Sequence, residues 1–138
     1  MIHSPTHAGC QTFGFLIWKW CKDRAQELIR TDWDAARLHP EVSITGLDHL
    51  LPLAPPEPGK LRLVQIEVDP EYAMTTDLNK PIIAAPLAPE HDDSGNRSVM
   101  VIDGWHRVYR ARREGREVLP IFLLSPDAEQ ACRIPIFI

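Results

Sequence analysis

VMVIDGWHRVYRARREG, residues 99–115, joins an apolar run to an arginine-rich segment through an Asp-Gly pair. The run VMVI is typical of a buried strand, and Gly104 permits a tight turn after it. Residues 104–114 then follow the spacing of a helix, and Gly115 is placed to end that helix in a left-handed cap. A strand, a turn and a helix are therefore expected in succession.

The start of the expected helix gathers groups that suit a phosphate. The first N–H groups of a helix, here those of Trp105, His106 and Arg107, lack intrahelical acceptors and lie at the positive end of the helix dipole. The side chains of His106 and Arg107 add donors, and Arg110 can face the same way. Asp103 is either the N-cap of this helix or a ligand of a nucleotide-bound magnesium ion. The alternative that these residues are only cap, core and solvated surface stays open.

Short runs rich in apolar residues predict further strands at 61–68, 81–87, 118–124 and 134–138. The polar segment 88–98 is typical of a hairpin turn, and its acidic cluster fits a solvated turn better than a cation site. Ser125 and Pro126 are typical of the N-cap and first residue of a last short helix. The sequence therefore predicts an α+β fold with a small mixed sheet of about four to five strands.

The first 60 residues are expected to form an N-terminal helical arm. Apolar positions recur at helical spacing over 17–29, and Thr31 or Asp32 is placed to cap a second helix that ends at Pro40. Residues 43–51 predict another helical turn. The proline-rich stretch 51–60 predicts an extended connector. The main domain is therefore expected at 61–138.

Composition restricts the classes of function. A net charge of -4 over 138 residues argues against a surface built wholly to grip nucleic-acid phosphates, although a local basic site remains possible. The three cysteines form no C-x-x-C pair, so we expect reduced thiols in a cytoplasmic protein. The apolar stretch 13–18 is too short to span a bilayer, and no signal peptide precedes it. No membrane partner is expected.

VIDGWHRVYRARREGREVLPIFLL, residues 101–124, resembles the core motif of the ParB/sulfiredoxin superfamily. That motif is a strand, a G-x-H-R turn, a helix, a glycine and a strand that opens with a proline. LRLVQIEVDPEY at 61–72 and LNKPIIAAPL at 78–87 are similar to its first two strands. The resemblance implies a nucleotide-binding fold whose phosphate ligands are Gly104, His106 and Arg107, with Lys80 as a further ligand.

The free-serine kinases of that superfamily have a D-G-H-H-R turn and a glutamate base after the first strand. By this resemblance Glu71 is the candidate base. Sulfiredoxins carry a reactive cysteine where this chain has Trp105, so reduction of a sulfinic acid is not expected. The helix-turn-helix domain of the chromosome-partition members is not expected after residue 124.

The resemblance implies a bound nucleoside di- or triphosphate, ATP, ADP or CTP, together with Mg²⁺. If the protein is an enzyme, it hydrolyses or transfers the terminal phosphoryl group, with Glu71 and Asp103 as the candidate catalytic residues. One alternative is a DNA-associated partition, nuclease or conjugation-control factor, whose arginines would contact DNA phosphates. These arginines are Arg107, Arg110, Arg112, Arg113 and Arg116. Another alternative is a protein-interaction module that binds no nucleotide.

Overall fold

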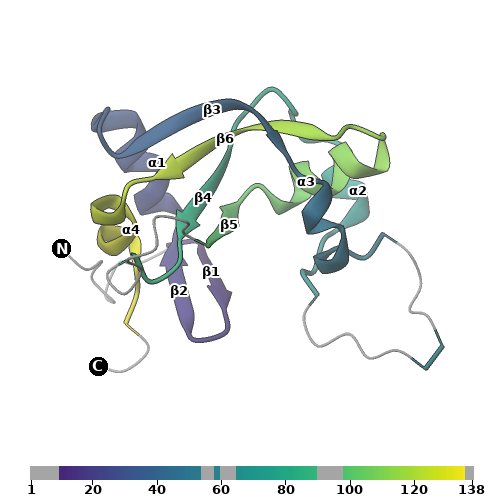
Figure 1. The fold of residues 1–138 in the computed structure, drawn as a ribbon, viewed down its shortest axis with the longest axis horizontal. Helices are drawn as coiled ribbons and strands as arrows, with labels where there is room; N and C mark the ends of the chain where they lie inside the picture. Colours follow the sequence, from purple (N-terminus) through teal and green to yellow (C-terminus); the bar gives the residue numbers. More distant parts are fainter. Residues whose placement is uncertain (1–9, 54–57, 60–64, 90–97, 136–138) are drawn as a thin grey trace. The chain divides into compact units, whose positions relative to one another are not determined.

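The protein is a mixed α+β fold with a four-stranded mixed sheet, a two-stranded sheet and a few short helices (Figure 1). The computed structural model describes residues 10–53, 58–59, 65–89 and 98–135. The elements are β1 (Thr12–Phe15), β2 (Trp18–Cys21), α1 (Lys22–Thr31), β3 (Ala36–Ser43), the 3-10 helix η1 (Thr45–Leu50), α2 (Pro70–Ala73), β4 (Ile82–Pro86), β5 (Val99–Asp103), α3 (Trp105–Arg113), β6 (Val118–Leu124) and α4 (Pro126–Cys132).

The larger sheet has the strand order β3-β6-β4-β5. Strands β4 and β5 are antiparallel. Strands β3 and β6 are also antiparallel, because Ser125 N donates to Ala35 O at one end and Ile44 N donates to Glu117 O at the other. The mixed character of the sheet therefore comes from the central pair, and β4 runs parallel to β6. Every residue of β4 is buried, as expected of a strand covered on both faces.

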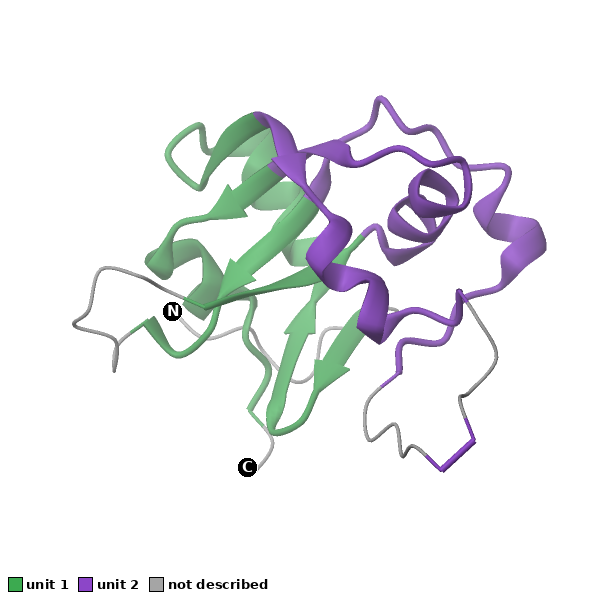
Figure 2. Cartoon of the chain, turned by 45° about the vertical axis from the view of Figure 1, so that its right-hand side comes forward, with its two compact units in different colours: residues 1–39, 83–103, 122–138 green, residues 40–82, 104–121 purple. Residues whose placement is uncertain are grey.

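The chain divides into two compact units, each assembled from segments distant in the sequence (Figure 2). Unit 1 comprises residues 1–39, 83–103 and 122–138, and unit 2 comprises residues 40–82 and 104–121. The domain boundary expected near residue 60 lies outside the described residues and stays a prediction.

In unit 1 a buried carboxylate is the centre of the packing between the β1–β2 hairpin and α4. The indole N–H of Trp20 donates to Glu129 Oε2 at 2.7 Å, and both side chains are fully buried. Arg133 Nη2 donates to Glu129 Oε1 at 2.6 Å. These donors satisfy a charge that would otherwise be costly to bury.

In unit 2 the helix α3 packs through an apolar side made by Trp105, Val108 and Ala111, which are buried. Arg112 reaches η1, where its Nε and Nη2 donate to the two carboxylate oxygens of Asp48 at 2.7 and 3.0 Å. This bidentate pairing is the strong form of an arginine–carboxylate contact.

The local signals after residue 80 predicted the elements correctly. Strands form at Ile82–Pro86, Val99–Asp103 and Val118–Leu124, and the helix after the turn is Trp105–Arg113. Gly115 has φ 79° and follows this helix as the left-handed cap. Ser125 Oγ caps α4 by accepting from Ala128 N. The helical turn expected within 43–51 is also confirmed as η1.

The helical arm is a wrong prediction in its details. Residues Thr12–Cys21 form the β1–β2 hairpin, so the only α-helix among the described residues of this region begins at Lys22. The second helix, expected to end at Pro40, is replaced by strand β3. Proline is tolerated there because β3 is an edge strand. The strand expected at 61–68 does not form over residues 65–68, and the hairpin tip at 90–97 lies outside the described residues.

The expectation of reduced thiols is also wrong for two of the cysteines. Cys10 and Cys21 form a disulfide, with their Cα atoms 6.1 Å apart. Cys132 is free and fully buried, and burial raises the pKa of its thiol to about 12. Across the described ranges, no helix is long and apolar enough to cross a membrane.

Candidate functional site

The turn before α3 depends on a glycine for reasons internal to the chain. Gly104 is the N-cap of α3 and has φ 105°, in the left-handed region that favours glycine. A Cβ placed there would lie 2.5 Å from Ile82 Cγ2 and 2.8 Å from Ile82 Cβ. The close approach that the glycine permits is therefore one between α3 and the first residue of β4.

Asp103 is not the N-cap of α3, which corrects one of the two roles expected for it. Its carboxylate accepts from Gln26 Nε2 at 2.8 Å and lies 3.7 Å from Lys22 Nζ. Both partners belong to α1, so Asp103 is tied into unit 1. The other predicted site residues belong to unit 2.

His106 joins α3 to α2. Its Nε2 accepts the backbone N–H of Asp69 at 3.2 Å, and its ring meets Tyr72 edge-on with the ring centres 4.8 Å apart. Because Nε2 is an acceptor, the neutral imidazole carries its proton on Nδ1. Asp69 Oδ1 in turn accepts from Glu71 N and Tyr72 N and so caps α2. His106 therefore holds the short helix that carries Glu71.

Arg107 holds the segment that leads into β4. Its side chain Nη1 donates to Lys80 O at 3.0 Å and to Pro81 O at 2.8 Å. The residue is only 7% exposed. Its guanidinium was expected to bind a phosphate, and the contacts described here give it an internal task as well.

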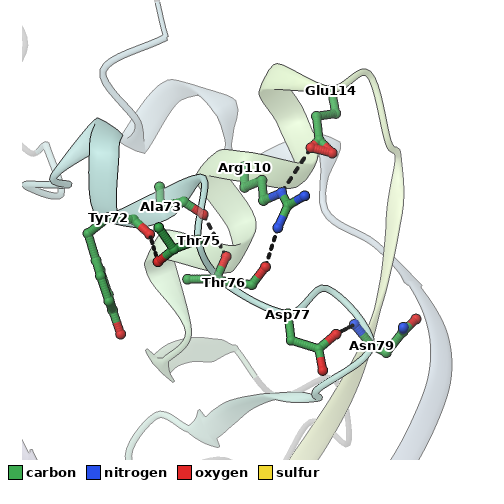
Figure 3. Close-up of polar contacts among 8 residues, drawn as sticks. All are labelled: Tyr72, Ala73, Thr75, Thr76, Asp77, Asn79, Arg110 and Glu114. Atoms are coloured by element: carbon green, nitrogen blue, oxygen red, sulfur yellow. Dashed lines mark hydrogen bonds and ion pairs between the residues drawn. The ribbon is translucent and has the colours of Figure 1, made fainter.

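Arg110 holds the loop between these two segments (Figure 3). Its Nη1 donates to Thr76 O, and its Nε donates to Glu114 Oε2 at 2.9 Å. The loop is also bonded internally, since Thr75 Oγ1 donates to Tyr72 O at 2.6 Å. The side chain of Arg110 thus lies between the loop and the last turn of its own helix.

Three side chains of α3 therefore grip one continuous segment, residues 69–81. His106 binds its start, Arg110 its middle and Arg107 its end. Within that segment Glu71 and Lys80 are exposed. The folding of unit 2 thus brings both residues to helix α3, which bears the other candidate residues, although both lie far from this helix in the sequence.

Sequence reasoning missed the residues that make this arrangement. Asp69 caps α2 and binds His106, and Thr76 supplies the carbonyl for Arg110. An Asp-Pro pair at 69–70 is a recognisable helix start, with proline at the first helical position. No local signal marks a backbone carbonyl as the acceptor of a distant arginine.

A hollow of about 690 Å³ borders the same segment in unit 2. It is lined by Pro52 and by residues 65–69, so it ends at the residue whose N–H binds His106. Glu67 in its wall and Glu71 beyond it are exposed carboxylates. Within the described ranges no cluster of three or more metal-ligating side chains occurs. Mg²⁺ needs no such cluster, because it is commonly bound by one or two carboxylates plus substrate phosphates.

The arginines that were candidates for DNA contacts have internal partners. Arg113 Nε donates to Tyr109 Oη at 3.0 Å, and its guanidinium lies 5.4 Å from the centre of that ring. Arg116 Nε donates to Val118 O at 2.9 Å. Together with the bonds of Arg107, Arg110 and Arg112, these contacts direct the basic side chains of residues 107–116 toward acceptors within unit 2.

Comparison with models of protein families, with curated proteins and with solved structures finds no match to this chain. Membership of the ParB/sulfiredoxin superfamily stays a prediction from the motif at 101–124.

Proposed function

We propose that unit 2 binds a nucleoside phosphate beside the first turn of α3, as the ParB/sulfiredoxin resemblance implies. The observation that carries the proposal is the grip of α3 on residues 69–81. His106, Arg107 and Arg110 hold that segment, and it presents Glu71 and Lys80 beside the helix. The backbone of Lys80 is thereby held beside the first turn of α3, which carries His106.

The contacts assign different tasks to the basic residues. Lys80 is exposed, so its ammonium group is the best candidate for a direct bond to phosphate oxygens. His106 is half-buried in the first turn of α3, where the helix dipole favours an anion. Arg107 and Arg110 act mainly as positioning residues, because they fix the backbone around Lys80 and Thr76.

The surrounding carboxylates fit a nucleotide that arrives with Mg²⁺. Glu67 and Glu71 are exposed on either side of Asp69. When bound, the metal ion would neutralise charge on the phosphates, and Glu67 is its candidate protein ligand. If a phosphoryl group is transferred, Glu71 remains the candidate base. Asp103 is a weaker candidate, because its carboxylate bonds Gln26 and lies near Lys22.

Titration calorimetry with ATP, ADP, CTP and GTP, with and without Mg²⁺, tests the proposal. Lys80→Ala and His106→Ala should each weaken binding about tenfold or more, since bonds to charged groups contribute about 1.5–3 kcal/mol. Lys19→Ala and His49→Ala, at exposed positions elsewhere, are the matched controls and should bind as the wild type does. Equal affinity in all five proteins would refute the site, and so would the absence of nucleotide binding at millimolar concentration.

The DNA-binding alternative receives less support, because the five arginines proposed for it donate to acceptors within unit 2. It predicts an affinity for DNA that falls steeply with salt concentration.

A further inference from the structure

A second and larger hollow, of about 920 Å³, lies in unit 1. It is formed where several strands of the large sheet begin or end. Its walls include the start of β3 at 36–39, the end of β6 with the residues after it at 123–126, and single residues at the end of β4 and the start of β5. The carboxyl ends of the parallel strands β4 and β6 thus meet at this hollow. Ligands of open sheets with parallel strands commonly bind outside such carboxyl ends.

Three apolar side chains in its wall are exposed to solvent. Trp33 is 88% exposed, Leu38 is 47% exposed and Val99 is 49% exposed. An indole in such a position keeps a large apolar surface in contact with water, which a planar ligand would cover by stacking. The volume falls in the usual range for small-molecule sites, about 300–1,000 Å³, which are mostly apolar with a few polar groups.

The polar groups of the wall restrict the chemistry of the ligand. Arg37 and His39 supply donors suited to an acidic group, and the guanidinium can bind two oxygens at once. Asp34 is an acceptor in the same wall and suits an amino group or ring N–H. A ligand that satisfies the whole wall has a planar ring, a hydrogen-bond donor on that ring and an anionic substituent.

We propose that this hollow is a binding site for an aminated aromatic heterocycle that carries an acidic group, of the size of a mononucleotide. Trp33 stacks on the ring, Asp34 accepts from its amino group, and Arg37 with His39 binds the acid. A peptide strand added to the edge of β3 fits less well, because Pro40 removes a backbone donor from that strand. This inference does not depend on the nucleotide site proposed in unit 2.

Titration calorimetry with AMP as the probe tests the site. Trp33→Ala and Arg37→Ala should each weaken AMP binding by about tenfold or more, as base–aromatic stacking and arginine–phosphate contacts of ordinary strength require. The exposed residues Ile17 and Arg30, each changed to alanine, provide matched controls and should leave binding unchanged. All four positions lie on the surface of unit 1, and circular dichroism verifies that each variant folds.

Two fragments of the probe separate the ring from the acid. Adenosine binding should depend on Trp33 and not on Arg37, whereas ribose 5-phosphate binding should depend on Arg37 and not on Trp33. The proposal is overturned if AMP does not bind, or if both substitutions leave its affinity unchanged. AMP binding that is lost in His106→Ala and retained in Trp33→Ala would also overturn it, and would support the unit 2 site instead.

Discussion

Replacing Arg107 by methionine is expected to destabilise the protein strongly, although the residue lies in a motif that suggests ligand binding. Arg107 is 7% exposed as a residue, and its Nη1 donates to both Lys80 O and Pro81 O. Two bonds from a charged donor contribute about 1.5–3 kcal/mol each. Methionine fills most of the volume of the arginine side chain and removes the cost of burying a charge. Both effects offset part of the stability lost with the hydrogen bonds. We expect a net decrease of about 3 kcal/mol in the free energy of unfolding.

Urea denaturation followed by circular dichroism and by tryptophan fluorescence measures this decrease. Two probes are needed because a chain with two compact units can unfold in more than one step. Arg113→Met is the matched control on the same helix, since Arg113 is exposed and its Nε donates to Tyr109 Oη one turn away. Its substitution should change stability by less than about 1 kcal/mol.

Comparing Arg107→Met with Arg113→Met also tests whether Arg107 anchors the segment that leads into β4. A decrease in Arg107→Met within about 0.5 kcal/mol of that in Arg113→Met would refute the assigned anchoring role, since substitutions away from special features fall in that range. Arg107→Lys retains a charge but loses the planar fork, so it should recover only part of the lost stability. These effects are expected in the absence of any nucleotide.

Three further outcomes are expected. Gly104→Ala should lower the unfolding free energy by about 3 kcal/mol in urea denaturation, because the new Cβ would collide with Ile82 at a φ of 105°. Reduction of the Cys10–Cys21 disulfide, which closes a loop with a sequence separation of 11, should lower it by about 2–3 kcal/mol and reduce Tm in a thermal scan. Burial raises the pKa of the Cys132 thiol to about 12. Cys132 should therefore resist alkylation by iodoacetamide at pH 8 until the protein unfolds, and mass spectrometry measures this reaction.

Each of these outcomes has a control. Gly46→Ala should be nearly neutral, because no atom outside the adjoining residues and the backbone of η1 lies within 4 Å of the added Cβ. Cys10→Ser should reproduce the effect of the reductant, and a Cys10→Ser protein as stable as the oxidised wild type would contradict the prediction. For Cys132 the folded pKa exceeds the ordinary value of 9.0, so its contribution to stability is present below pH 9 and is lost as the pH rises toward 12. The stability difference between the wild type and Cys132→Ala should change in that interval and stay constant below it.

Local sequence signals were sufficient for the second half of the fold. Strand β5 was predicted from its own apolar run, although it pairs with β4. Helix α3 and the left-handed Gly115 were predicted because each depends on neighbours within a few residues. The same holds for α4, whose Ser125 cap and Pro126 start are adjacent in the chain. Such signals succeed where a cap, a turn and a hydrophobic period agree.

The first half was predicted less well because its structure depends on distant pairing. Trp20 and Cys21 fit the helical spacing of 17–29, but they belong to β2. There Trp20 is buried, and its indole donates to Glu129, 109 positions away. Strand β3 likewise exists through its pairing with β6. A short apolar run can fit both the helical and the strand period. Its packing partners then decide which structure it adopts, and a single sequence does not specify those partners.

In the candidate site too, local sequence predicted some features and distant contacts decided the others. Spacing along residues 103–110 sufficed to identify the helix, its glycine and its cluster of basic side chains. Where those side chains go was decided by folding: Arg107 reaches carbonyls 26 and 27 positions away, and Asp103 turns to α1. Donors can be recognised from residue type, but a backbone acceptor exists at every residue, so only the packed chain selects which one an arginine meets.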